Sequence, residues 1–175
     1  MIREITKKEN TQVRRHLNNW GVFDYFKNKS FIIKENSDNL KTLCMISENL
    51  KDLIFFPHTY SSGIGLGILT SRNFFPLPAF LYFITKYSNS FPYIAVNEES
   101  ENLVLYGRDI FGESIIETSE NIKENSMVLI LNKGKEPLGI GKTRFSLSRI
   151  KEKDMITVKT LLDLGMYLRD ENKLD

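Results

Sequence analysis

The residues best suited to chemistry in this sequence are seven lysines and arginines in its second half. The chemistry that they suit is the neutralisation of phosphate groups. A lysine or arginine beside a backbone phosphate supplies affinity, salt dependence and register, but it does not identify a base. We expect these residues to form one nucleic-acid interface, with the largest contributions from Lys151, Lys153 and Lys159. The seven are Arg108, Lys142, Arg144, Arg149, Lys151, Lys153 and Lys159.

The net charge of +2 conceals a segregation of charge along the chain. Residues 133–159 carry 8 Lys and Arg against 3 Asp and Glu, whereas residues 95–132 carry 2 against 8. Residues 1–94 carry 12 against 7. A basic block inside an acidic half is typical of a surface that binds phosphates. A solvated lysine-rich surface explains the charge equally well, so both interpretations stay open on charge alone.

Two glycine-containing segments resemble nucleotide-binding loops, but neither fits. Gly141-Lys142-Thr143 looks like the end of a P-loop, yet Glu136 stands where that motif needs its first glycine. The segment 63–68 has Ile68 where a dinucleotide-binding turn needs its third glycine. The alternating apolar residues of this segment favour a strand with glycines on one face, where a neighbour can approach closely.

Residues for metal binding or covalent catalysis are few. His16, Cys44 and His58 are far apart in the sequence and show no spacing typical of a metal site or a catalytic triad. Cys44 lies between apolar neighbours, where burial raises the pKa of a thiol and makes it inert. We therefore expect no cofactor, no metal and no catalytic residues, and we interpret the protein as a non-enzyme.

Composition points to a soluble, cytoplasmic protein with no membrane partner. The single cysteine in 175 residues excludes an internal disulfide. The first ten residues carry charges where a signal peptide needs an apolar run. The most apolar stretch, 74–85, is interrupted by two prolines and is too short to span a bilayer.

The first part of the chain, residues 1–95, reads as an α/β domain. Thr6 and Glu9 form a capping box that starts a helix, and Gly21 is placed to end it. Strands are expected at 31–34, 43–46, 64–68 and 93–96, and a helix at 78–86. The basic residues of the first helix could touch nucleic acid, but solvated helix positions also account for them. They are Lys7, Lys8, Arg14 and Arg15.

The second part, residues 96–175, reads as a small β-barrel. The polar segment 97–102 (NEESEN) is interpreted as the linker between two domains. Short strands are expected at 103–106, 127–131, 138–143 and 156–158, with a closing helix at 161–168. Aromatic residues that could stack on a base are few: Phe111, Phe145 and Tyr167.

Three motifs of the second part, in their order, resemble the signature of a PUA domain, the RNA-binding fold named for pseudouridine synthases and archaeosine transglycosylases. In the first part, Ser62-Gly63, Gly67, Leu69-Thr70, Phe75 and Leu77 resemble the N-terminal domain of Nip-seven-type factors, which assemble the large ribosomal subunit in archaea and eukaryotes. The three motifs are Leu105-Tyr106-Gly107, Pro137-Leu138-Gly139-Ile140-Gly141 and Asp163-Leu164-Gly165-Met166-Tyr167-Leu168-Arg169.

The resemblance implies an N-terminal α/β domain for protein contacts and a C-terminal PUA domain for RNA. It implies a non-catalytic factor in large-subunit rRNA maturation that binds single-stranded, uridine-rich pre-rRNA. It implies assembly factors as partners, among them the Shwachman–Bodian–Diamond syndrome protein family. An archaeal source is expected.

The chain departs from its relatives at three positions where they can be basic. Ile68 lies in the glycine strand, Met155-Ile156 begins the last strand, and Leu162 precedes the Asp-Leu-Gly motif. The basic residues lie upstream instead, at 149, 151 and 153.

Two other functions stay open. One is a protein–protein adaptor that docks a partner on exposed aromatic residues of the first domain. The other is an accessory domain of an RNA-processing or RNA-modification complex. The adaptor's expected docking residues are Phe55, Phe56, Phe74, Phe75 and Tyr82.

Overall fold

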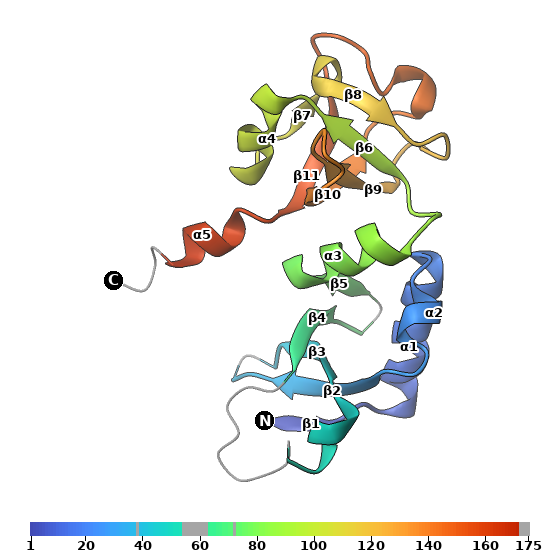
Figure 1. The fold of residues 1–175 in the computed structure, drawn as a ribbon, viewed down its shortest axis with the longest axis vertical. Coiled ribbons are helices and arrows are strands. Elements are labelled where there is room, and N and C mark those ends of the chain that lie inside the picture. The colour runs from blue at the N-terminus through green and yellow to red at the C-terminus, as the bar shows by residue number, and fades with distance from the viewer. Residues whose placement is uncertain (38, 54–62, 72, 172–175) are drawn as a thin grey trace. The chain divides into compact units, whose positions relative to one another are not determined.

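A computed structural model describes residues 1–171 apart from 38, 54–62 and 72. The chain divides into two compact units, Met1–Asn89 (unit 1) and Ser90–Asp175 (unit 2). Each unit has its own sheet (Figure 1). No helix among the described residues is both long enough and apolar enough to cross a membrane.

Unit 1 is built on a five-stranded antiparallel sheet whose strands follow one another in sequence order. The order is β1 (Ile2–Glu4), β2 (Ser30–Glu35), β3 (Lys41–Ile46), β4 (Ile64–Leu69) and β5 (Phe74–Pro76). Three α-helices accompany it, together with the 3-10 helix η1 (Glu48–Leu53). The α-helices are α1 (Lys7–Asn19), α2 (Phe23–Phe26) and α3 (Pro78–Tyr87).

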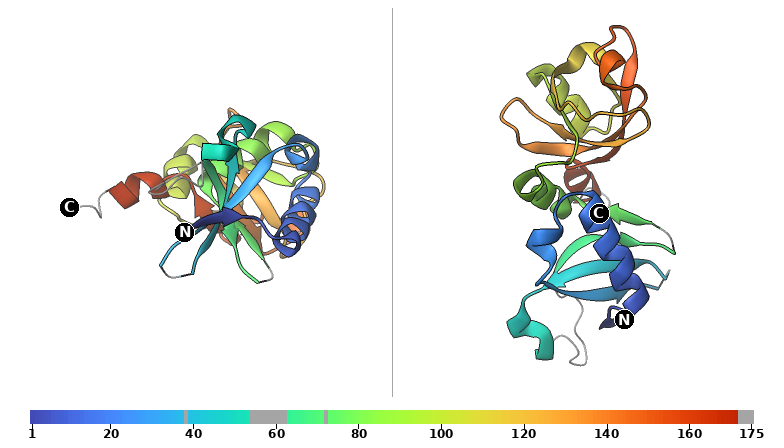
Figure 2. Two further views of the ribbon diagram at one scale, coloured as in Figure 1. Left: turned by 90° about the horizontal axis from the view of Figure 1, so that it is seen from below. Right: turned by 90° about the vertical axis from the view of Figure 1, so that its right-hand side faces the viewer.

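The core of unit 1 is aromatic. Helices α1, α2 and α3 lie together on one face of the sheet (Figure 2). The Trp20 ring lies 5.2 Å from that of Phe80 and 5.6 Å from that of Phe74. Gly67 leaves room for the Phe74 ring, because a Cβ at this glycine would lie 2.3 Å from it. The predicted close approach at this glycine strand is therefore confirmed.

Unit 2 contains a six-stranded sheet in the order β7-β11-β10-β9-β6-β8, with only β6 and β9 parallel among its pairs. The edge strands β7 and β8 are joined by the three residues of η2, so the two edges lie close together and the sheet is nearly a closed barrel. Branched aliphatic residues such as Ile94, Ile130 and Val158 fill the interior. The strands are β6 (Tyr93–Val96), β7 (Ile110–Phe111), β8 (Ile115–Thr118), β9 (Met127–Leu131), β10 (Pro137–Thr143) and β11 (Ile156–Asp163). The helices are α4 (Glu98–Leu105), η2 (Gly112–Ser114), η3 (Leu147–Arg149) and α5 (Met166–Glu171).

The segment predicted as a linker and the strand predicted after it are both part of helix α4. The Asn97 side chain accepts a hydrogen bond from the Ser100 backbone N–H at 3.0 Å and starts this helix. Three glutamates occupy its first turn, where the helix dipole favours negative charge. A charged segment that looked like a linker is thus a well-formed helix N-terminus.

Two further expectations need correction. Strand β11 continues to Asp163, so the helix expected over 161–168 starts only at Met166. The strand expected at 93–96 exists, but it pairs with β9 and β8 in unit 2. The structure divides the chain between Asn89 and Ser90, whereas the sequence placed the boundary after residue 95.

Candidate nucleic-acid interface

Arg108 is held at the end of helix α4 by a glycine turn. Gly107 adopts φ +75°, a left-handed conformation that glycine reaches without steric cost. Its N–H donates to the Val104 carbonyl at 2.8 Å, and the Arg108 N–H donates to the Leu103 carbonyl at 2.9 Å. These two bonds form a Schellman motif, so the backbone of Arg108 is fixed.

A partly buried ion pair attaches this turn to the end of β11. The Arg169 guanidinium donates to both carboxylate oxygens of Asp163, at 2.9 and 2.8 Å, and also to the Leu105 carbonyl. Gly165 lies against the same carbonyl, where a Cβ has no room. The first and last signature motifs are therefore adjacent, and their polar residues hold the fold together.

The middle motif brings strand β10 close to β11. A Cβ at Gly139 would lie 2.2 Å from the Leu162 carbonyl oxygen, and one at Gly141 would lie 2.4 Å from the Val158 side chain. The pairing shifts by one residue between Ile140 and Gly141, which leaves Leu161 at a bulge and half exposed. These two glycines therefore make room for the neighbouring strand β11.

Three of the predicted basic residues form one group on the outside of this strand pair, the strand patch (Lys142, Arg144 and Lys159). Lys142 and Lys159 are direct cross-strand partners, and both are exposed. Arg144 follows on the same side of β10, and its N–H donates to the Thr157 carbonyl at 2.8 Å. Like charges directly opposite each other repel. The patch therefore favours an anion as a ligand.

Arg149 has an intramolecular partner for its charge. Its guanidinium bonds the Glu152 carboxylate at 2.8 Å, and this bond raises the pKa of Arg149. It also lies 4.4 Å from the centre of the Phe145 ring. Phe145, one of the aromatic candidates for base stacking, is thus covered on that face.

Lys151 and Lys153 lie in the turn that follows η3. The Lys151 ammonium donates to the Ile116 carbonyl of strand β8 at 2.8 Å. Lys153 is exposed, and the next residue, Asp154, bonds Glu113 through its backbone N–H. Through its bond to Ile116, Lys151 is attached to β8, which pairs with β6 and with neither β10 nor β11. In the sheet, the seven predicted residues therefore do not form a single row.

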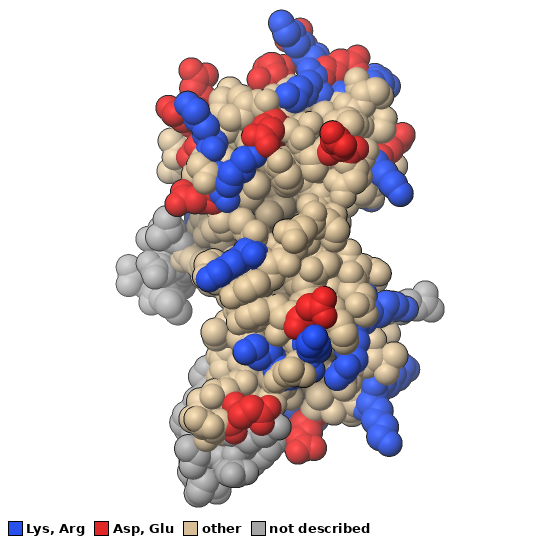
Figure 3. All heavy atoms as spheres, turned by 45° about the vertical axis from the view of Figure 1, so that its right-hand side comes forward, with Lys and Arg blue, Asp and Glu red and all other residues tan. Residues whose placement is uncertain are grey.

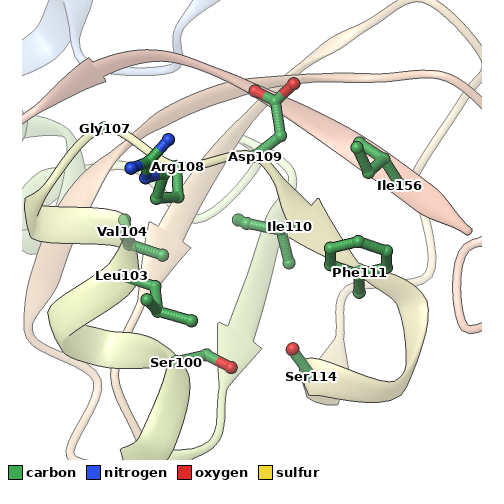
Figure 4. A pocket seen from close by; sticks show the side chains of 10 residues that line it. All are labelled: Ser100, Leu103, Val104, Gly107, Arg108, Asp109, Ile110, Phe111, Ser114 and Ile156. Carbon is green, nitrogen blue, oxygen red and sulfur yellow. The ribbon is translucent and has the colours of Figure 1, made fainter. Parts of the chain in front are cut away.

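Arg108 lines a surface hollow of about 490 Å³ between helix α4, strand β7 and strand β11. The Phe111 ring, 43% exposed, forms part of its wall (Figure 4). The Asp109 carboxylate points away from the hollow and accepts the Thr160 N–H at 3.0 Å. The hollow thus combines a cation with an accessible aromatic face, a combination that suits stacking of a base.

Sequence reasoning missed the groups that position this region. Asp109 accepts from Thr160, and the Arg108 carbonyl accepts from the Thr160 hydroxyl at 2.8 Å. Together they join the loop that carries Arg108 to the middle of β11. An acidic residue between a basic residue and an apolar strand gives no signal of this role in the sequence. Among the described residues, no group of three or more His, Cys, Asp or Glu side chains is placed to hold a metal ion.

Comparison with known proteins identifies both halves of the chain. Residues 2–77 match the family model described as the NIP7/UPF0113 pre-PUA domain, and residues 92–172 match the UPF0113 PUA domain. A UPF0113 protein of Archaeoglobus fulgidus is 33% identical over 173 residues, covering 97% of this chain and 95% of the relative.

Two solved structures share the fold over nearly the whole chain. A PUA domain protein from Thermoplasma acidophilum has a TM-score of 0.69 at 14% identity and covers 98% of this chain and 99% of its own. A hypothetical protein from Pyrococcus horikoshii has a TM-score of 0.66 at 19% identity, with 93% and 94% covered. The predicted architecture, an α/β domain followed by a PUA-type barrel, is confirmed.

Proposed function

This chain belongs to the NIP7/UPF0113 family, and from that premise we propose that it is a non-catalytic RNA-binding factor of large-subunit rRNA maturation. It binds single-stranded, uridine-rich pre-rRNA through the PUA domain. The observation that supports this most is the strand patch, where Lys142 faces Lys159 across a strand pair. Two lysines held opposite each other repel, and a phosphate between them relieves that repulsion.

The interface that we propose has two parts. The strand patch and Arg108 contact the backbone phosphates. Arg108 is grouped with the patch because its carbonyl accepts a hydrogen bond from Thr160, the residue that follows Lys159 on β11. The hollow beside Phe111 accepts a base. Arg149 and Lys151 contribute less, because both already have partners in the protein. Lys153 contributes less because it lies in the turn after η3, outside the strand patch.

The test is a salt titration with the full-length chain and uridine-rich or adenine-rich single-stranded RNA. On a single strand, removing one basic side chain that neutralises a phosphate lowers the salt slope by about 0.7. The triple variant Lys142→Gln/Arg144→Gln/Lys159→Gln should therefore reduce the slope of log affinity against log salt by about 2. The double variant Lys151→Gln/Lys153→Gln should change it less.

The matched control is Lys133→Gln, an exposed lysine of the same unit that lies outside the interface. An unchanged slope in the triple variant would reject the strand patch. A larger loss in the double variant would move the interface to the β8 side. If the wild-type chain bound neither RNA, the proposed function would be wrong.

A protein–protein adaptor is the second candidate, and one observation favours it. Tyr25 and Tyr87 stack with ring centres 4.0 Å apart, and Tyr82 is 53% exposed nearby on α3. Lys86 lies over both Tyr82 and Tyr87. Exposed tyrosines with little rotational freedom are common anchors of protein interfaces. We propose this aromatic surface as the docking site for other assembly factors, such as the Shwachman–Bodian–Diamond syndrome protein family.

The residues expected to form that docking surface differ in how exposed they are. Phe74 is 3% exposed and belongs to the aromatic core, so its expected role in docking is wrong. Phe75 and Tyr82 are each 53% exposed and stay candidates. Phe55 and Phe56 lie outside the described residues.

A further inference from the structure

The hollow between helix α4, strand β7 and strand β11 contains a serine hydroxyl that does not help to hold the fold together. Ser100 lies in the first turn of α4 and is only 7% exposed, and it lines the hollow. Its backbone N–H is bonded, but its hydroxyl has no hydrogen-bond partner among the residues that the structure describes. Buried polar side chains in folded proteins nearly always have a partner. A ligand that enters the hollow can supply this one.

A second hydroxyl, that of Ser114 in η2, lines the same hollow. Asn97 fixes it relative to Ser100, because the Asn97 side chain accepts the Ser100 N–H at 3.0 Å and the Asn97 N–H donates to the Ser114 carbonyl at 2.9 Å. In Figure 4 the two serine hydroxyls are directed toward one another on one side of the hollow. The Ser114 hydroxyl also has no partner within the described part of the chain. Both groups are thus in place before a ligand arrives, so binding would order few groups.

The other polar side chains make the hollow rich in hydrogen-bond donors. The Arg108 guanidinium can only donate, and the described residues give it no partner. Of the described residues that line the hollow, only Asp109 is acidic, and its carboxylate points away and accepts the Thr160 N–H. A serine hydroxyl can donate or accept. The hollow therefore presents donors to a ligand but no carboxylate acceptor.

The charged surface of unit 2 does not explain a preference for one base over another. In Figure 3, basic and acidic side chains are interspersed on the face of this unit that is shown. Contacts between cations and phosphates carry no base identity, and an aromatic ring such as that of Phe111 can stack on any base. Selection among bases needs hydrogen bonds to a base edge. Ser100, Ser114 and Arg108 are the side chains of the hollow that can make them.

We propose that Ser100 and Ser114 read the edge of the base that enters the hollow and select a base with carbonyl oxygens over adenine. This inference rests on the proposed function, in which the hollow accepts a base. Uracil presents two carbonyl oxygens with an N–H between them. Arg108 and one serine donate to the carbonyl oxygens, and the other serine accepts from the N–H. Adenine has no carbonyl oxygen, so it leaves a donor of the hollow unpaired, which costs binding free energy.

The experiment measures the binding of full-length Ser100→Ala, Ser114→Ala and the double variant to uridine-rich and adenine-rich single-stranded RNA across a salt series. Loss of one hydrogen bond in the hollow should weaken binding of uridine-rich RNA about fivefold to tenfold and leave binding of adenine-rich RNA unchanged. The preference for uridine-rich RNA should fall by the same factor. The salt slope should stay the same for both RNAs, because a hydroxyl neutralises no phosphate.

Two comparisons separate base reading from general effects. Ser148→Ala removes the hydroxyl of an exposed serine of the same unit that lies outside the hollow, and it should change neither affinity. Phe111→Leu removes the stacking ring and should weaken binding of both RNAs alike. Alanine is the best helix former, so Ser100→Ala should fold, and thermal unfolding of each variant checks this.

Equal losses on both RNAs in the serine variants would overturn the proposal, because they would show that the serines only shape the hollow. No loss in any serine variant, with the strand-patch variant still defective, would overturn base reading and leave the proposed function intact. A wild-type chain that bound both RNAs equally well would overturn base selection and the uridine preference, but not RNA binding. Absence of binding to either RNA would overturn the proposed function as well.

Discussion

At the scale of single residues, the charges of this protein divide into those that are paired and those that are exposed. Glu9 accepts from the Arg3 guanidinium at 2.7 and 2.9 Å and is 13% exposed. Lys142 and Lys159, in contrast, face each other on an exposed surface. Buried or half-buried pairs stabilise the fold, whereas exposed like charges leave an attraction for ligands.

The Glu9–Arg3 pair predicts a specific pH dependence of stability. The hydrogen bond from Arg3 holds the pKa of Glu9 well below its ordinary value of 4.5. The stability that this carboxylate contributes is therefore complete above pH 4.5 and is lost as the pH falls below it. Glu9→Gln keeps the capping-box geometry and removes the charge, so it should cost about 1–2 kcal/mol at neutral pH.

Denaturant unfolding of both proteins between pH 7 and pH 3 checks this. The difference in unfolding free energy between wild type and Glu9→Gln should shrink below pH 4.5. A difference that stays constant down to pH 3 would show that the charge of Glu9 is unimportant. Lys41→Gln is a suitable comparison, because that lysine makes a longer contact with Glu9, at 3.3 Å, and is more exposed.

At the scale of elements, the glycines of unit 2 serve packing and turns. Gly107 ends helix α4, Gly139 and Gly141 let β10 approach β11, and Gly165 lies against the end of α4. Three segments far apart in sequence meet because each has a residue without a side chain at the point of contact. Arg169 then joins two of these segments, because its guanidinium bonds both Asp163 and the Leu105 carbonyl.

The glycine turn after α4 gives a prediction at this scale. Gly107→Ala should destabilise the protein by about 1 kcal/mol, because alanine is strained at positive φ. Gly107→Asn should cost less, because asparagine tolerates the left-handed region. Thermal unfolding of the two variants measures the difference. Equal destabilisation in both would mean that the contact with Asp163, 3.3 Å from a Cβ, decides the cost.

Much of the element pattern could be predicted from periodicity and caps. The capping box at Thr6 and Glu9, the glycine strand expected at 64–68 and the helix starting at Pro78 are confirmed. The errors occurred in two segments, one whose charge concealed a helix and one whose strand is longer than its apolar pattern indicated. Helix α4 has too many glutamates to look like a helix in an apolar pattern, and β11 contains a bulge that disturbs its alternation.

The candidate site was predictable only in part, because pairing decides which charges are adjacent. Lys142 and Lys159 are far apart in sequence and directly opposite in the sheet. Lys151 and Lys153 lie closer to Lys159 in sequence, but they lie in the turn that follows η3, and Lys151 is bonded to β8. The sequence shows which residues are basic, whereas the register of β10 against β11 determines which of these basic residues lie next to each other.

At the scale of the whole molecule, the position of the division between units decides whether the sheet of unit 2 keeps all its strands. Strand β6 lies between β9 and β8, and Ile94, Ala95 and Val96 are almost completely buried. A boundary after residue 95 would remove most of a central strand from unit 2. A boundary at 89/90 keeps the sheet complete.

Two fragments test this division. Residues 90–175 should fold alone, with a cooperative thermal transition and protected amides in β9 and β11. Residues 96–175 should remain largely unfolded, because β9 would lose its parallel partner and the core would lose Ile94. Circular dichroism and hydrogen exchange distinguish the two outcomes. Native-like protection in the shorter fragment would show that β6 is dispensable.

The strand order also sets the time at which each unit can be completed during synthesis. In unit 1 each strand pairs with the one before it, so its sheet can grow as the chain leaves the ribosome. In unit 2 the last strand, β11, is placed between β7 and β10. The barrel therefore stays open until residue 163 has emerged, and the Asp163–Arg169 pair can form only six residues later. A nascent chain paused before β11 would expose the unpaired edges of β7 and β10, the edges most prone to wrong pairing.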